Sequence, residues 1–115
     1  MTNYTHGHHA EKVAAHYLRA EGYKLYALNW RTPRAEIDLI VQRPGGPLTF
    51  VEVKYRQSGR QGAGLAYITP SKLKQMEFAA RLWVAEHHYS GEYTLAAVEV
   101  SGADYRVTAF IASIL

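Results

Sequence analysis

Residues 35–42, AEIDLIVQ, and residues 48–55, LTFVEVKY, decide the fold. Both stretches alternate polar and apolar side chains with the two-residue period of a β-strand. Residues 43–47, RPGGP, separate them with a proline- and glycine-rich turn, which predicts an antiparallel hairpin. The alternation predicts that one face of this hairpin fills the core with Ile37, Leu39, Val51 and Val53.

The same hairpin carries the candidate chemistry. Glu52 and Lys54 are two residues apart, so they project from one face, and a favourable register would bring Asp38 beside them. Mg²⁺ prefers hard oxygen ligands and takes one or two carboxylates from a protein, and the Val53 carbonyl would be a third oxygen. Lys54 would orient or deprotonate an attacking water, or stabilise charge on phosphorus. A Glu-x-Lys pair on a solvent-facing strand is nevertheless common, and by its spacing alone it more often has no function.

Outward from the hairpin, hydrophobic periodicity predicts two helices and three further strands. The helices cover residues 8–21 and 71–88, and the strands cover residues 24–29, 95–100 and 105–110. Gly22 follows the first helix, and Thr69-Pro70 is a favourable start for the second. The order α-β-β-β-α-β-β predicts an α/β sandwich around a mixed sheet.

Bulk properties narrow the class of protein. A chain of 115 residues suits a single domain, 1–115. No apolar run approaches the ~18–20 residues that span a bilayer, and no signal peptide is recognisable, so we expect a cytoplasmic protein without a membrane partner. The absence of cysteine excludes disulfides and a cysteine nucleophile. A formal charge of +3 is a weak indication of nucleic-acid binding.

Several segments together resemble one family. They are Glu36-Ile37-Asp38-Leu39-Ile40, Phe50-Val51-Glu52-Val53-Lys54 with Arg56, Ala10-Glu11 with Ala14 and Leu18, Asn29-Trp30-Arg31, and Ile68-Thr69-Pro70 with Lys72. In this combination the chain resembles the YraN family of bacterial proteins, also called UPF0102. The chain departs from the family pattern at Ala35, where glycine is usual, and at Tyr55, where a smaller residue is usual.

The resemblance implies a restriction-endonuclease-like three-layer sandwich with a PD-(D/E)xK active site, related to archaeal Holliday-junction resolvases. It implies that Asp38, Glu52 and Lys54 are the D, E and K of that motif, and that Glu11 joins the metal site. The activity implied is Mg²⁺- or Mn²⁺-dependent hydrolysis of DNA, with branched or recombination intermediates as substrates by analogy. Resolvases act as dimers, so the resemblance is compatible with a homodimer, and the oligomeric state stays open because nothing in the sequence identifies an interface.

Five basic residues are candidates for phosphate contacts: Arg31, Arg34, Arg56, Arg60 and Lys72. Lys72 lies in the first turn of a predicted helix, where a cation opposes the helix dipole but would meet a phosphate that the helix terminus attracts. Arg56 and Arg60 belong to a glycine-rich loop, residues 56–64, that would follow a phosphate backbone. Solvated surface positions explain these residues equally well. Two other functions therefore stay open: a nucleic-acid-binding module without turnover, and a protein-interaction module.

Overall fold

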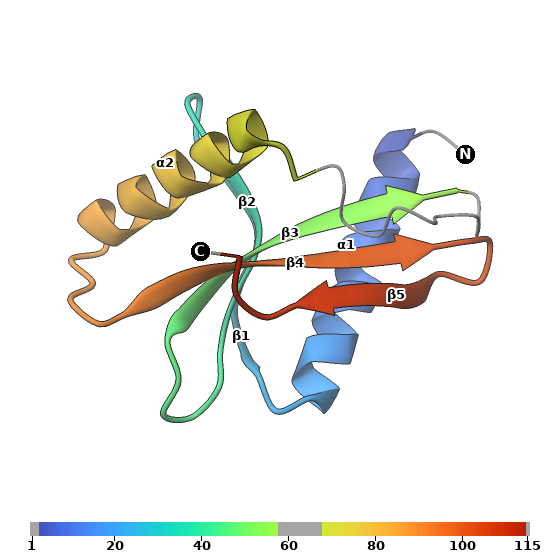
Figure 1. The fold of residues 1–115 in the computed structure, drawn as a ribbon, viewed down its shortest axis with the longest axis horizontal. Helices are drawn as coiled ribbons and strands as arrows, with labels where there is room; N and C mark the ends of the chain where they lie inside the picture. The colour runs from blue at the N-terminus through green and yellow to red at the C-terminus, as the bar shows by residue number, and fades with distance from the viewer. Residues whose placement is uncertain (1–2, 58–67, 115) are drawn as a thin grey trace.

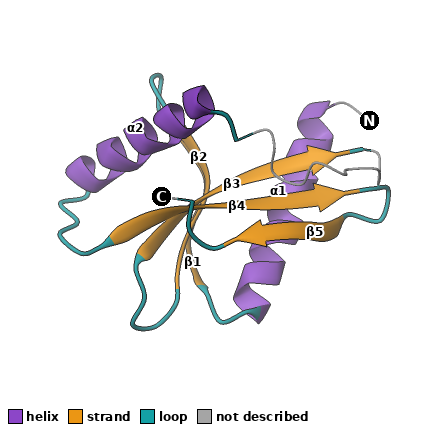
Figure 2. Ribbon diagram, viewed as in Figure 1, coloured by secondary structure: helices purple, strands orange, loops and turns teal. Residues whose placement is uncertain are grey.

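A five-stranded mixed sheet lies between two helices (Figure 1). The structure, a computed structural model, describes residues 3–57 and 68–114. Helix α1 (Asn3–Ala20) covers one face of the sheet and helix α2 (Pro70–Glu86) covers part of the other (Figure 2). The strands, in their order across the sheet, are β1 (Lys24–Arg31), β2 (Glu36–Gln42), β3 (Leu48–Arg56), β4 (Tyr93–Ser101) and β5 (Arg106–Ile111). The predicted order and three-layer α/β class are confirmed.

Helix α1 begins at Asn3, five residues before the predicted start, whereas the end of α1 and the start of α2 lie close to the predicted positions and have local causes. Gly22 adopts φ +98°, and the Tyr23 N–H donates to the Leu18 carbonyl, so the chain leaves α1 through a glycine turn. The Thr69 hydroxyl accepts from the Lys72 N–H at 3.1 Å, and Pro70 is the first residue of α2. This cap fixes where the first turn of α2, with Lys72, meets the sheet.

The strand pairing confirms the hairpin. β2 pairs antiparallel with both β1 and β3, β3 pairs parallel with β4 through the α2 crossover, and β4 pairs antiparallel with β5. The β2–β3 ladder runs from Gln42/Leu48 to Leu39/Val51. Asp38 and Glu52, the next residues on each strand, lie where the ladder ends.

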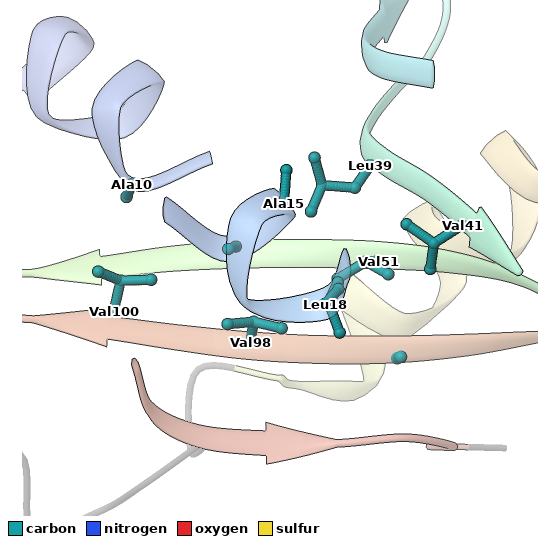
Figure 3. Packing of buried hydrophobic residues seen from close by; sticks show 10 residues of the cluster. Ala10, Ala15, Leu18, Leu39, Val41, Val51, Val98 and Val100 are labelled. Atoms are coloured by element: carbon teal, nitrogen blue, oxygen red, sulfur yellow. The ribbon is translucent and has the colours of Figure 1, made fainter. Parts of the chain in front are cut away.

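Alternation along β3 divides the core into two clusters. Val51 and its neighbours pack with the alanine-rich face of α1, and Figure 3 shows Leu18 and Ala15 of this helix beside Leu39, Val41 and Val51. Phe50, on the opposite face, packs with Met76, Ala79 and Ala80 of α2. Glu52 and Lys54 continue the Phe50 side of the strand, as the alternation predicted.

The expected position of Ile37 was wrong. Ile37 packs in the α2 cluster, whereas Leu39 packs in the α1 cluster, so the alternation of β2 is broken at Asp38. Asn29 lies opposite Asp38 on β1 and has φ +58°, a left-handed conformation that asparagine tolerates better than most residues. This irregularity lies at the level of the candidate site.

Among the residues described, no helix combines the length and apolar character that crossing a bilayer requires.

Candidate active site

Asp38 occupies the fork between β2 and β3. Its Oδ2 accepts a hydrogen bond from the Val53 N–H at 2.7 Å. The carboxylate thus takes a donor on β3 just beyond the end of the β2–β3 ladder. This contact ties the first motif residue directly to the strand that carries the other two. Val53 meets Asp38 through its amide N–H, whereas the sequence-based expectation concerned its carbonyl oxygen.

Three carboxyl groups share this region, and burial raises the pKa of each. Burial and, to a smaller extent, the charge of Glu11 raise the pKa of Asp38 to about 7, against the opposing Val53 hydrogen bond. Burial and the charge of Asp38 raise the pKa of Glu52 to about 7, although Lys72 opposes the change. Burial also raises the pKa of Glu11, whose carboxyl hydrogen-bonds to that of Asp38. α1 therefore brings a third acid to the site, at the residue where the resemblance placed it.

A lysine of α2 reaches Glu52. The Lys72 Nζ lies 3.0 Å from the Glu52 Oε2, and both side chains are mostly buried. The Thr69 cap positions this lysine in the first turn of α2. Lys54 projects from the same side of β3 as Glu52 and is more exposed.

The acids are divided between two partners. Glu11 contacts Asp38, while Glu52 contacts Lys72. Within residues 3–57 and 68–114, no three His, Cys, Asp or Glu side chains are grouped closely enough to hold a metal ion. The chemistry of the donors matches the expected metal site, but a cage of three carboxylates is not formed in this conformation.

A cleft opens beside Glu52, between the β1–β2 connection and α2. Its volume is about 690 Å³. Its lining includes Glu52 and three residues that sequence analysis proposed for phosphate contacts, Arg31, Arg34 and Lys72. The fold therefore brings three of these five basic residues to one hollow beside an acid of the motif.

Arg56 has a different environment. Its Nε lies 2.6 Å from the Oε2 of Glu99, a residue of β4 with 0% exposure. The Thr108 hydroxyl donates to the other oxygen of Glu99 at 2.9 Å. The guanidinium of Arg56 thus pairs with a buried acid of the sheet, whereas the sequence-based expectation placed Arg56 in a loop that contacts phosphates. The predicted role of Arg60 falls on a residue outside those described.

Glu99 was not predicted as a functional residue from the sequence. In β4, YTLAAVEVS, it is the one charged residue, and a lone acid in a buried strand needs a partner. The single charge in this apolar strand could have drawn attention to Glu99, but the sequence does not show which residue pairs with it. Glu99 also lies opposite Lys54 in the parallel β3–β4 register, so it places a carboxylate beside the strand position of the motif lysine.

Comparison with known proteins supports one assignment. The model of the uncharacterised protein family UPF0102 matches residues 10–106. A UPF0102 protein of Methylococcus capsulatus is 38% identical over 83% of this chain and 76% of its own length. A UPF0102 protein of Neisseria meningitidis serogroup C is 41% identical over 74% of this chain and 73% of its own length. The matched range spans the positions of Glu11, Asp38, Glu52, Lys54 and Lys72, and the chain belongs to the UPF0102 family.

Proposed function

We propose that this protein is a divalent-metal-dependent endonuclease that hydrolyses DNA phosphodiester bonds, with branched or recombination intermediates as its substrates. The observation that carries the proposal is the setting of Asp38, whose carboxyl hydrogen-bonds with that of Glu11 and whose charge acts on Glu52, while burial raises the carboxyl pKa of all three residues. Perturbed acids beside a cleft are typical of functional sites. We place this activity in the cytoplasm, and a homodimer would present two such sites to paired strands.

The donors suit a hard divalent cation such as Mg²⁺ or Mn²⁺. Carboxylate oxygens are the ligands these ions prefer, and mutual repulsion among the three acids would be relieved by a positive charge between them. Asp38 and Glu52 would hold the ion, with Glu11 and the Val53 carbonyl as further oxygens. When bound, the ion would polarise a phosphate oxygen and acidify a water molecule.

The surrounding residues have distinct roles in this proposal. The Val53 N–H holds the Asp38 carboxylate in the fork. Lys54 orients or deprotonates the attacking water, or stabilises charge on the phosphate. Lys72, which lies within 3.0 Å of Glu52, would move its charge to the scissile phosphate when substrate enters the cleft. Arg31 and Arg34 would hold neighbouring phosphates.

One observation favours a second function, a nucleic-acid-binding module without turnover. Lys72 already pairs with Glu52, and this ion pair competes with a cation for the same carboxylate. If the pair persists when nucleic acid binds, the cleft would retain phosphate but the acids would not assemble around a metal.

The test is cleavage of labelled branched, duplex and single-stranded DNA in Mn²⁺, Mg²⁺ or EDTA. Glu52→Gln and Lys54→Ala should each abolish metal-dependent cleavage. Glu92→Gln, which changes an exposed acid in the connection between α2 and β4, is the matched control and should cut like the unmodified protein. Cleavage that persists in both site variants would reject this site. Binding without cleavage in any metal would select the binding module.

A further inference from the structure

An exposed aromatic ring forms part of the cleft wall. Phe78 of α2 has 38% exposure and lines the cleft beside Glu52. Across the described residues, the other large hydrophobic side chains with comparable exposure are Tyr26, Leu28 and Ile111, and these do not line the cleft. Phe78 is therefore the exposed ring that a substrate in the cleft would meet.

A guanidinium accompanies the ring. The Arg34 Cζ lies 5.3 Å from the centre of the Phe78 ring, so the β1–β2 connection and α2 meet in a cation–π contact at this wall. Both side chains remain exposed to solvent. A guanidinium and an aromatic ring are the two planar groups on which proteins stack nucleobases.

The charge of the cleft favours a phosphate chain. Its lining includes four cations, Arg31, Arg34, Lys72 and Lys74, against two carboxylates, Glu36 and Glu52. Lys72 and Phe78 are six residues apart on α2, which is about 9 Å along the helix axis. At the stacked spacing of about 3.4 Å per nucleotide, this separation corresponds to two or three nucleotides. A strand whose scissile phosphate lies at Glu52 and Lys72 would thus present a nearby base to Phe78.

We infer that Phe78 and Arg34 form a stacking site for an unpaired nucleobase, and that this site selects substrates with single-stranded character next to the scissile phosphate. The inference rests on the proposed nuclease function, because it takes the strand in the cleft to be the substrate. Paired bases are stacked inside a duplex and present no free face to a side chain, whereas an unpaired base does. A fully paired duplex would meet the cleft cations but would gain nothing from the ring.

Binding measured in EDTA separates stacking from hydrolysis. The probe is a labelled single-stranded oligodeoxynucleotide with one 2-aminopurine, and its fully paired duplex is the comparison. Phe78→Ala and Phe78→Leu should each weaken single-strand binding about tenfold, while Phe78→Tyr should stay within about twofold. Duplex affinity should be unchanged in all three. Tyr26→Ala removes an exposed aromatic ring outside the cleft and should alter neither affinity.

The leucine variant distinguishes stacking from apolar contact, and unchanged thermal melting would show that each variant folds. Quenching of 2-aminopurine by the unmodified protein, lost in Phe78→Ala, supports the site. Binding of an oligoribonucleotide of the same sequence shows whether the protein prefers RNA or DNA. If the affinity for either nucleic acid depends on the Phe78 ring, the result supports the site. Equal losses on single strand and duplex, no loss in Phe78→Ala, or no single-strand binding would overturn the inference. If the ring proves necessary but no DNA is cut in Mg²⁺ or Mn²⁺, the nuclease proposal fails and the stacking site stands.

Discussion

Asp38→Asn should stabilise the folded protein at pH 8. In the folded protein, one oxygen of the Asp38 carboxyl accepts from the Val53 N–H, and the carboxyl also hydrogen-bonds with that of Glu11. An asparagine has the same shape, with a carbonyl to accept from Val53 and an NH₂ group to donate to Glu11. The substitution therefore keeps both contacts and removes a buried negative charge.

The size of the effect follows from the pKa of Asp38, which rises from 3.8 to about 7 on folding. The folded state binds this proton more tightly than the unfolded chain, so the contribution of Asp38 to stability is greatest below about pH 4 and is lost as pH rises through about 7. Each pKa unit corresponds to about 1.4 kcal/mol, which sets an upper limit of about 4 kcal/mol at pH 8. Part of the pKa shift reflects repulsion that Asp38 shares with Glu11 and Glu52, so we expect the substitution to raise the free energy of unfolding by less than this limit. The expected gain is about 2 kcal/mol, which corresponds to about 8 °C in Tm.

The assay is thermal and urea unfolding between pH 4.5 and 8, without divalent metal. Variant and unmodified protein should nearly coincide at pH 4.5 and separate progressively toward pH 8. Asp104→Asn is the matched control, because it makes the same chemical change at an exposed carboxylate. The reasoning would be refuted by a stability difference that is the same at every pH, or by an Asp38→Asn variant that is less stable than the unmodified protein at pH 8.

Three further predictions concern the same face of the sheet. Mn²⁺ should bind more tightly as pH rises from 6 to 8, and its binding should release protons, because the acids must ionise to coordinate it. Calorimetry in buffers of different ionisation enthalpy should show the change in affinity and the proton release, and Glu52→Gln should weaken both of these effects. Arg56→Ala should lower the free energy of unfolding, measured in urea, by about 3 kcal/mol, because it leaves Glu99 buried without its cation. Arg31→Ala breaks an exposed ion pair and should lower this free energy by less than about 1 kcal/mol. Lys72→Ala should weaken binding of duplex and single-stranded DNA alike and reduce the salt dependence of binding by about one counterion, as measured by anisotropy across a salt series.

The sequence by itself determined the local features of the fold. Alternation separated the two sides of β3, so Glu52 and Lys54 were correctly placed together. Thr69-Pro70 and Gly22 marked helix ends because caps and glycine turns depend on a few adjacent residues. The Pro/Gly turn predicted the β2–β3 hairpin for the same reason.

Tertiary structure decided what surrounds those residues. The position of Ile37 depended on a break in alternation at Asp38, opposite the left-handed Asn29 of another strand. Glu11 meets Asp38, and Lys72 meets Glu52, only because each helix packs on its own face of the sheet. The raised pKa values of these acids follow from that burial and proximity. A sequence specifies short-range geometry through backbone preference, but the partners of a buried charge depend on how distant elements pack.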